Sequence, residues 1–341
     1  MDRYSRQILF SSIGEIGQKK IRNSHILIIG AGALGSASAE MLTRAGIGKI
    51  TMADRDYVEW SNLQRQQLYT EEDAENRLPK AIAAKQRLKA VNSEVEIESV
   101  VEDITAQSIE LLLKDHCDLI IDATDNFETR LLINDAAQKY KIPWIYGGCV
   151  GSYGLTFTIL PGETPCLACM LNHLPADGMT CDTVGIISPA VQMVASYQTA
   201  EALKWITGNH EQMRRKLLSF DVWTNQFTQI SIDSMKKKDC PSCGESPTYP
   251  NLSFENMTKT AVLCGRDTVQ IRPGQKREIS FELLEKQLNG NGSVREIQAN
   301  PYLISFKVDE YRFVVFRDGR ILLHGIKDVV KAKTLYHQYL G

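Results

Sequence analysis

A glycine-rich turn near the start of the chain is the pattern with the clearest chemistry. The apolar run 26–29 leads into Gly30-Ala31-Gly32-Ala33-Leu34-Gly35, and the next apolar run ends at Asp54. A strand that enters a G-x-G-x-x-G turn and then a helix directs backbone N–H groups and the positive helix end at one point, which suits a nucleotide phosphate. An acidic residue roughly 20 positions later suits a ribose hydroxyl. The pattern predicts a nucleotide site that includes Gly30, Gly32, Gly35 and Asp54.

Charged residues beyond Asp54 help to distinguish a triphosphate from a dinucleotide. Hydride transfer has no need of cations at the phosphates, whereas a triphosphate needs its charge neutralised. Arg65 and Lys80 are expected near the carboxyl edge of the sheet, and Asp125 follows an apolar strand that ends at the same edge. A carboxylate there can hold Mg²⁺ against the phosphates. ATP with Mg²⁺ is favoured, and a nicotinamide-dependent oxidoreductase stays open as an alternative, because the glycine turn and Asp54 alone fit it.

Two C-x-x-C pairs form the second pattern with chemistry, Cys166 with Cys169 and Cys240 with Cys243. Two thiolates from each turn can converge on tetrahedral Zn²⁺, and four sulfur ligands leave no open position. The pairs therefore predict a structural zinc site, with a redox pair as the alternative. Cys181 belongs to neither pair and lies in the stretch 166–189, whose Gly, Pro, Asn and Asp content predicts a long irregular crossover.

Composition disfavours several classes of partner. The 341 residues carry a formal net charge of −2, which provides no field that would attract nucleic acid or an anionic membrane. No apolar stretch approaches the roughly 20 residues that span a bilayer, and the N-terminus lacks the plan of a signal peptide. We therefore expect a cytoplasmic protein with reduced thiols and with neither nucleic acid nor membrane as a partner.

Hydrophobic periodicity predicts the elements that position these residues. Strands and helices alternate along the first part of the chain, which is typical of an α/β protein with a Rossmann-like, doubly wound, mostly parallel sheet. The expected strands are 26–29, 49–54, 95–101, 118–123, 144–147, 156–160, 217–222 and 227–232, and the expected helices are 35–45, 80–90, 108–114, 130–140 and 190–207. We predict an ATP-binding domain over 1–244, a linker over 245–260 and a small C-terminal α+β domain of unknown role over 261–341. The last contains expected strands at 268–271, 302–308, 311–316 and 321–324 and helices at 280–288 and 329–339.

Together these motifs resemble those of a known family. Residues 2–244 are similar to the ThiF/MoeB adenylyltransferases of the ubiquitin-activating superfamily. The motifs that carry the resemblance are Arg3-Tyr4-x-Arg6-Gln7, the glycine turn, Asp54, Ser61-Asn62-Leu63-Gln64-Arg65-Gln66, Lys80, Asp122-x-Thr124-Asp125-Asn126 and the two C-x-x-C pairs. The resemblance implies that Asp54 holds the ribose, that Asn62 contacts the phosphates and that Arg6 reaches the ATP of the partner subunit in a homodimer. Cys181 matches the position where ThiF-type members carry a cysteine that can bond to the sulfur carrier.

The resemblance also implies a reaction. ATP would adenylate the C-terminal glycine carboxylate of a ubiquitin-like sulfur carrier ending in Gly-Gly, with release of pyrophosphate, for thiamine or molybdopterin cofactor biosynthesis. No general base is needed, because a C-terminal carboxyl with a pKa near about 3.5 is already ionised at neutral pH. The residues do not distinguish a ThiS-like from a MoaD-like carrier. A cysteine desulfurase or sulfurtransferase is a further candidate partner, and a non-catalytic binder of ubiquitin-like proteins is the remaining alternative, which the presence of Arg65, Lys80 and Asp125 disfavours.

Overall fold

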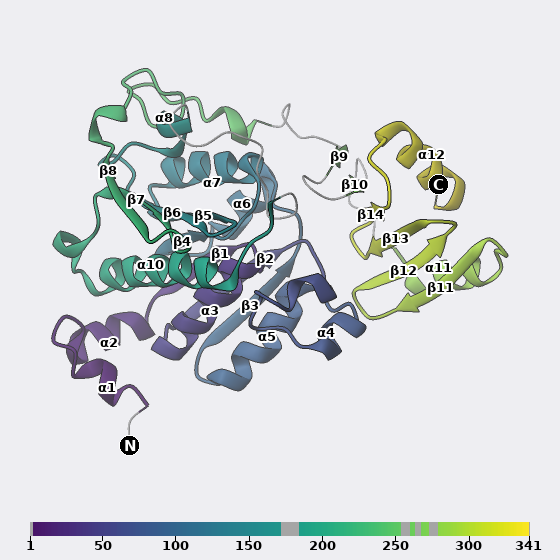
Figure 1. Ribbon diagram of the computed structural model, residues 1–341, viewed down its shortest axis with the longest axis horizontal. Coiled ribbons are helices and arrows are strands. Elements are labelled where there is room, and N and C mark those ends of the chain that lie inside the picture. Colours follow the sequence, from purple (N-terminus) through teal and green to yellow (C-terminus); the bar gives the residue numbers. More distant parts are fainter. Residues whose placement is uncertain (1–2, 172–183, 254–259, 263–266, 273–278, 341) are drawn as a thin grey trace. The chain divides into compact units, whose positions relative to one another are not determined.

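The computed structural model describes residues 3–171, 184–253, 260–262, 267–272 and 279–340 (Figure 1). The chain divides into two compact units, Met1–Asn256 and Met257–Gly341. Among the described residues, no helix combines the length and the apolar character needed to cross a bilayer.

The first unit is built on an eight-stranded sheet in the order β3-β2-β1-β4-β5-β6-β7-β8. The strands are β1 (His25–Ile29), β2 (Lys49–Asp54), β3 (Glu96–Val101), β4 (Leu119–Asp122), β5 (Trp144–Val150), β6 (Tyr153–Ile159), β7 (Lys216–Asp221) and β8 (Gln226–Ser231). Neighbours from β3 to β5 are parallel, and β5 to β8 are antiparallel. The predicted doubly wound, mostly parallel sheet is confirmed. Because the strand order reverses between β1 and β4, a ligand crevice is expected at the carboxyl ends of these two strands.

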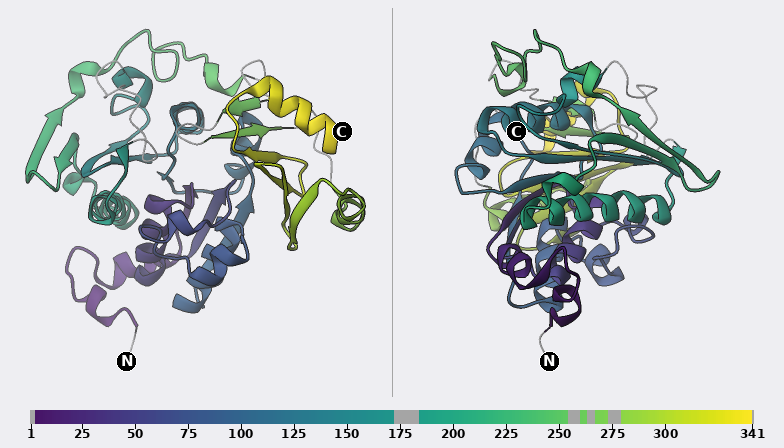
Figure 2. Two further views of the ribbon diagram at one scale, coloured as in Figure 1. Left: turned by 45° about the vertical axis from the view of Figure 1, so that its right-hand side comes forward. Right: turned by 90° about the vertical axis from the view of Figure 1, so that its left-hand side faces the viewer.

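Helices cover both faces of this sheet (Figure 2). They are α1 (Ser5–Ile8), α2 (Gly14–Arg22), α3 (Ala33–Ala45), α4 (Glu71–Glu75), α5 (Lys80–Val91), α6 (Ala106–Leu112), α7 (Phe127–Tyr140), α8 (Leu167–Met170) and α10 (Ser188–Thr207), with 3₁₀ turns η1 (Trp60–Asn62), η3 (His210–Gln212), η4 (Asp233–Met235) and η5 (Pro250–Leu252). Alternate residues of β1 serve the two faces. Leu27 and Ile29 pack with residues of α6 and α7, whereas Ile26 and Ile28 pack with residues of α2, α3, α5 and α10.

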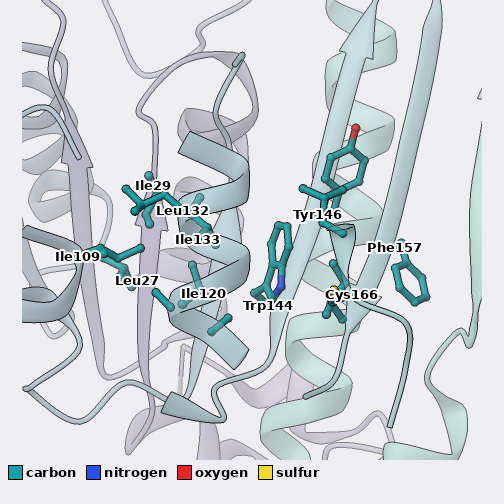
Figure 3. Packing of buried hydrophobic residues seen from close by; sticks show 14 of the residues in the cluster. Leu27, Ile29, Ile109, Ile120, Leu132, Ile133, Trp144, Tyr146, Phe157 and Cys166 are labelled. Carbon is teal, nitrogen blue, oxygen red and sulfur yellow. The ribbon is translucent and has the colours of Figure 1, made fainter. Parts of the chain in front are cut away.

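The core under α7 continues into the region of the first cysteine pair. Leu132 and Ile133 of α7 pack in one cluster with Trp144, Phe157 and Cys166, and Figure 3 shows Trp144 between the α7 side chains and Cys166. Trp144, Phe157 and Cys166 are fully buried. Cysteines of the C-x-x-C pairs are therefore part of the packed interior of the first unit.

The second unit contains a six-stranded antiparallel sheet in the order β11-β12-β13-β14-β10-β9. Its elements are β9 (Thr260–Val262), β10 (Thr268–Ile271), α11 (Phe281–Asn289), β11 (Val294–Ala299), β12 (Leu303–Val308), β13 (Tyr311–Phe316), β14 (Ile321–His324) and α12 (Val329–Tyr339). Apolar residues of both helices join one face of the sheet in a separate core. The predicted small α+β module is confirmed, although β9 and β11 were not predicted.

Candidate nucleotide site and thiolate cluster

The glycine turn between β1 and α3 is closely packed, which explains two of its glycines. Gly30 has φ +97°, and a Cβ there would lie 2.5 Å from the carbonyl oxygen of Ala123. A Cβ on Gly35 would lie 1.9 Å from the carbonyl oxygen of Gly30. Gly32 is the N-cap of α3, and no side chain in the described part of the chain caps this end. The first N–H groups of α3 can therefore serve an anion.

Asp54 connects the end of β2 to the glycine turn. Its Oδ2 accepts a hydrogen bond from the backbone N of Ala31 at 2.6 Å, and its Oδ1 accepts one from the backbone N of Asp56 at 2.6 Å. Burial raises the pKa of the Asp54 carboxyl, while the nearby Lys80 ammonium acts against this shift. The carboxylate thus lies beside the turn, where the sequence places the ribose.

Lys80 is the first residue of α5 and only 3% exposed. Its Nζ lies 3.5 Å from Oδ2 of Asp56, and its backbone N donates to the carbonyl oxygen of Asp56 at 2.9 Å. Asp56 was not predicted as a site residue. Its position two residues after Asp54 was the available signal, because side chains at i and i+2 of an extended segment share a face.

Arg55 is a further cation that the sequence reasoning missed. Its Nη1 donates to Oδ1 of Asp103 at 3.2 Å, and its Nε lies 3.9 Å from Oδ1 of Asp56. Burial lowers the pKa of the Arg55 guanidinium, but the carboxylates of Asp103, Asp56 and Asp125 outweigh burial and raise it. Asp125 therefore exerts its field on the same group of charges as Asp56.

Asn62 is the last residue of η1 and Arg65 lies just after it, and both side chains have local hydrogen-bond partners. Arg65 Nη1 donates to the carbonyl oxygen of Ser61 at 2.8 Å. Asn62 is buried, and its Oδ1 accepts from the backbone N of Glu59 at 3.0 Å. This bond completes a reciprocal cap of the 3₁₀ turn, so Asn62 also stabilises the turn from which Arg65 extends.

Two buried polar side chains donate hydrogen bonds to the backbone at the end of β4 and just after it. Arg130 Nε donates to Oδ2 of the fully buried Asp122 at 3.1 Å, and Arg130 Nη2 donates to the carbonyl oxygens of Thr124 at 2.7 Å and Gly147 at 2.9 Å. Gln198 Nε2 donates to the carbonyl oxygen of Asp122 at 2.8 Å. Asp125 itself is exposed. Arg130 and Gln198, which the sequence reasoning missed, thus fix the backbone that presents Asp125.

Strand register brings these groups to one edge. Ile29 of β1 lies opposite Ala53 of β2 and Asp122 of β4, so Gly30, Asp54 and Ala123 follow side by side. Arg6, by contrast, is exposed on α1, and no hydrogen bond or ion pair within the described residues joins it to this edge. Cys181 lies outside the described residues. The edge can bind an anionic nucleotide and a divalent cation, with exposed Asp125 as the available carboxylate.

The four cysteines of the two pairs converge as predicted. All four Sγ atoms lie within 4.8 Å of one another, with separations of 3.9 Å for Cys166–Cys169, 3.6 Å for Cys166–Cys240 and 3.5 Å for Cys169–Cys243. Tetrahedral Zn²⁺ with Zn–S bonds of about 2.3 Å holds its sulfurs about 3.8 Å apart, whereas a disulfide requires about 2.05 Å. Hydrogen bonding from the Cys166 thiol lowers the pKa of Cys243, while the same hydrogen bond and burial raise the pKa of Cys166. The cluster therefore fits a four-thiolate metal site.

The fold and this edge define a Rossmann-like nucleotide-binding protein with an added thiolate cluster. The family model described as the ThiF family matches residues 4–242. The chain is 56% identical over 339 residues to the sulfur carrier protein ThiS adenylyltransferase of Bacillus subtilis, covering 99% of each chain. It belongs to the ThiF family.

Two relatives from Escherichia coli are shorter. The ThiS adenylyltransferase is 34% identical over 249 residues, which cover 73% of this chain and 97% of the relative. The molybdopterin-synthase adenylyltransferase is 32% identical over 247 residues, which cover 72% and 97%. Both are matched nearly end to end by about three quarters of this chain.

Solved structures with the same fold include E. coli MccB crystallised with ATP. Its TM-score is 0.62 at 22% sequence identity, and the match covers 71% of this chain and 74% of MccB. At this level of identity the likeness supports the fold alone.

Proposed function

We propose that this chain uses Mg·ATP to adenylate the C-terminal glycine carboxylate of a ThiS-like, ubiquitin-like sulfur carrier ending in Gly-Gly. The observation that carries the proposal is the convergence of the glycine turn, Asp54, Lys80 and Asp125 at one sheet edge in a member of the ThiF family. A ThiS-like carrier is preferred to a MoaD-like one because the B. subtilis relative, alike over 99% of both chains, is a ThiS adenylyltransferase. The reaction would serve thiamine biosynthesis.

The reaction balances without a general base. A carrier carboxylate oxygen attacks the α-phosphorus of ATP, and the bond from that phosphorus to the oxygen bridging to the β-phosphate breaks. The products are the carrier acyl-adenylate and pyrophosphate. Because the carboxyl is ionised at neutral pH, the protein has to supply positive charge and in-line placement.

Each edge residue has a role in this proposal. Asp54 holds the ribose, the glycine turn and Asn62 bind phosphates, and Lys80 and Arg65 neutralise charge that develops around the α-phosphate. Asp125 would hold Mg²⁺, which neutralises the departing pyrophosphate. Lys80 is paired with Asp56 at 3.5 Å before substrate binds, so this ion pair has to open when the phosphates arrive.

Further assignments complete the proposal: the first rests on the spacing and convergence of the cysteines, and the others rest on the family resemblance. The four-cysteine cluster binds a structural Zn²⁺. Arg6 acts in a homodimer, where it reaches the ATP of the partner subunit. Cys181 bonds covalently to the sulfur carrier: its thiolate attacks the acyl carbon of the acyl-adenylate, the bond from that carbon to the AMP phosphate oxygen breaks, and a thioester and AMP result. A cysteine desulfurase or sulfurtransferase is the further partner, as the source of the sulfur that the activated carrier receives.

Exchange of radiolabelled pyrophosphate into ATP tests the central proposal. The full chain should catalyse exchange only when Mg²⁺ and a Gly-Gly-ended ThiS-like carrier are both present, and a carrier lacking its last glycine should not support it. Absence of exchange together with tight NAD binding would instead support the oxidoreductase alternative. Binding of the carrier without ATP affinity would support a non-catalytic binding protein.

A further inference from the structure

Helix α7 contacts two sites. One is the nucleotide edge, formed by the glycine turn, Asp54, Lys80 and Asp125, and the other is the thiolate cluster of Cys166, Cys169, Cys240 and Cys243. The N-cap of α7, Asn126, follows Asp125 directly and accepts a hydrogen bond from the backbone N of Thr129 at 2.8 Å. One turn further, Arg130 binds Asp122 and the carbonyl oxygen of Gly147. The amino-terminal half of α7 is therefore fixed to the edge that presents Asp125.

The next turn of the same helix contacts the first cysteine pair. Asn134 is fully buried, and its Oδ1 accepts a hydrogen bond from the backbone N of Leu167 at 2.8 Å. Leu167 directly follows Cys166 and begins α8. This bond fixes the turn that carries Cys166 and Cys169.

The neighbouring residue contacts the segment that follows the second cysteine pair. Asp135 is also fully buried, and its Oδ2 accepts from the backbone N and the side-chain Nδ2 of Asn251, at 2.9 and 2.8 Å. Tyr249, two residues earlier, donates its backbone N to the carbonyl oxygen of Pro241 at 3.1 Å, within the Cys240–Cys243 turn. A further bond of 3.4 Å joins Asn134 Nδ2 to Asp135 Oδ1. Two adjacent buried side chains thus hold segments that are far apart in sequence.

We propose that Asn134 and Asp135 are positioning residues that hold the two cysteine pairs in their metal-binding arrangement. Through the rigid body of α7 they also couple metal retention to the nucleotide edge. Asn126 and Asn134 are separated by about 12 Å along the helix at a rise of about 1.5 Å per residue. Because Cys166 and Cys240 are 74 positions apart, neither pair can orient the other through local chain geometry. The positioning role rests on the proposed metal site alone, and the coupling rests also on the proposed binding of ATP at the edge.

The rate of zinc release from the full-length, zinc-loaded chain to a chromogenic chelator tests the positioning role. Asn134→Leu removes the acceptor for the Leu167 N–H at similar volume, and we expect release to be about 10-fold faster or more, as for other outer contacts of metal sites. Asp135→Asn keeps the shape and one acceptor, so a smaller acceleration is expected, and this variant covers the case in which Asn134→Leu does not fold. Gln138→Met is the matched control, since Gln138 is a buried carboxamide on the same helix whose Nε2 has no partner in the described structure.

Release at the parental rate from folded Asn134→Leu would overturn the positioning role. Equal acceleration by Gln138→Met would do the same, because any disturbance of α7 would then suffice.

The coupling has its own readout. Saturating Mg·ATP should slow zinc release from the parental chain by about 5-fold, the lower end of typical couplings between sites, and should have little effect on release from Asn134→Leu. If ATP slows both proteins equally, or slows neither although calorimetry shows that it binds, the coupling is refuted. A chain that binds no ATP at all would contradict the proposed function instead, while the release rates without nucleotide would still report on Asn134 and Asp135.

Discussion

The nucleotide edge and the thiolate cluster both belong to the first unit, but they are assembled in different ways. The edge is created by topology, because the parallel neighbours β2, β1 and β4 end side by side, with Gly30, Asp54 and Ala123 adjacent at their carboxyl ends. The cluster is created by tertiary contacts, since its two pairs are brought together from positions 74 residues apart. Strand order brings the residues of the first together, with Arg130 and Gln198 fixing the segment that presents Asp125, whereas the second depends on buried side chains such as Asn134 and Asp135 for its assembly.

The two sites also differ in how their charged groups are satisfied. At the edge, Lys80 is paired with Asp56, and Arg65 binds a carbonyl oxygen of its own turn. Both contacts are made by long, flexible side chains, which in the proposed reaction exchange them for phosphate oxygens. In the cluster, four thiols satisfy one another within 4.8 Å. Contacts that can be exchanged, as at the edge, suit a substrate that enters and leaves. Four thiols that bind only one another suit a metal that stays bound.

Replacement of Lys80 should have the largest effect. Lys80→Met removes a buried cation from the edge and should lower kcat/KM for pyrophosphate exchange by about 10²- to 10³-fold, the range for loss of one group that stabilises transition-state charge. The circular dichroism spectrum and the zinc content should remain parental. Lys85→Met, at an exposed position of the same helix, is the control and should retain exchange. Full activity of Lys80→Met would remove this residue from the site.

Disruption of the cluster should act on stability. Cys243→Ser should abolish stoichiometric zinc and lower the free energy of unfolding by about 3 kcal/mol, less than the about 10–16 kcal/mol that zinc contributes in isolated finger peptides, because the sheet core remains. Denaturant unfolding followed by far-ultraviolet circular dichroism measures this. Cys149→Ser, a half-buried thiol outside the cluster, should keep its zinc and most of its stability. If Cys243→Ser binds zinc as the parental chain does, the four-thiolate assignment is wrong.

Replacement of Asp54 should weaken nucleotide binding more moderately. Asp54→Asn loses charge-assisted hydrogen bonds, each worth about 1.5–3 kcal/mol, so the Kd for Mg·ATP should rise by about 10-fold or more. Burial raises the pKa of the Asp54 carboxyl. As the pH falls through that raised value, the carboxylate becomes protonated and ATP affinity should decline. Calorimetric titrations over a pH series should show this acid limb in the parental chain and lose it in Asp54→Asn; an unchanged limb would assign it to another group.

The comparison also explains how much of the molecule could be predicted from the sequence. The bounds expected for β2, β10, β13 and β14 match those observed, because apolar runs between turn residues fix short strands. The glycine turn and Asp54 were accessible because their geometry depends on local backbone. Arg130 and Gln198 were not, since each binds carbonyl oxygens of strands distant in sequence. Strand β11 lacks clear alternation, because its register shifts between Arg295 and Gln298.

Short helix α8 and the reciprocal cap of Asn62 were missed for a related reason. Stretch 166–189 has a composition typical of irregular structure, yet Leu167–Met170 forms a helical turn. The first N–H of this turn, that of Leu167, donates a hydrogen bond to Asn134 Oδ1. Asn62 was assigned to phosphates by the family resemblance alone, and its bond to Glu59 adds a local role. In both cases the local structure depends on one hydrogen bond that cannot be predicted from composition.

The smallest expected effect is the most direct test of exchangeability at the edge. If phosphate must displace Asp56 from Lys80, Asp56→Asn removes the competitor, and the Kd for Mg·ATP should fall by a factor of about 2 to 5. A hydrogen bond contributes about 0.5–1.5 kcal/mol net, and the one from Lys80 Nζ to Asp56 Oδ2 is long at 3.5 Å. Glu98→Gln is the matched control, because it also removes one negative charge from an ion pair with a lysine. In that pair Lys49 Nζ lies 3.0 Å from Glu98 Oε2, at the amino end of β2 and therefore away from the edge. The Kd of this control should be parental. Weaker ATP binding in Asp56→Asn would show that Asp56 orients Lys80 for the nucleotide, so that the edge, like the cluster, is held in place before its ligand arrives.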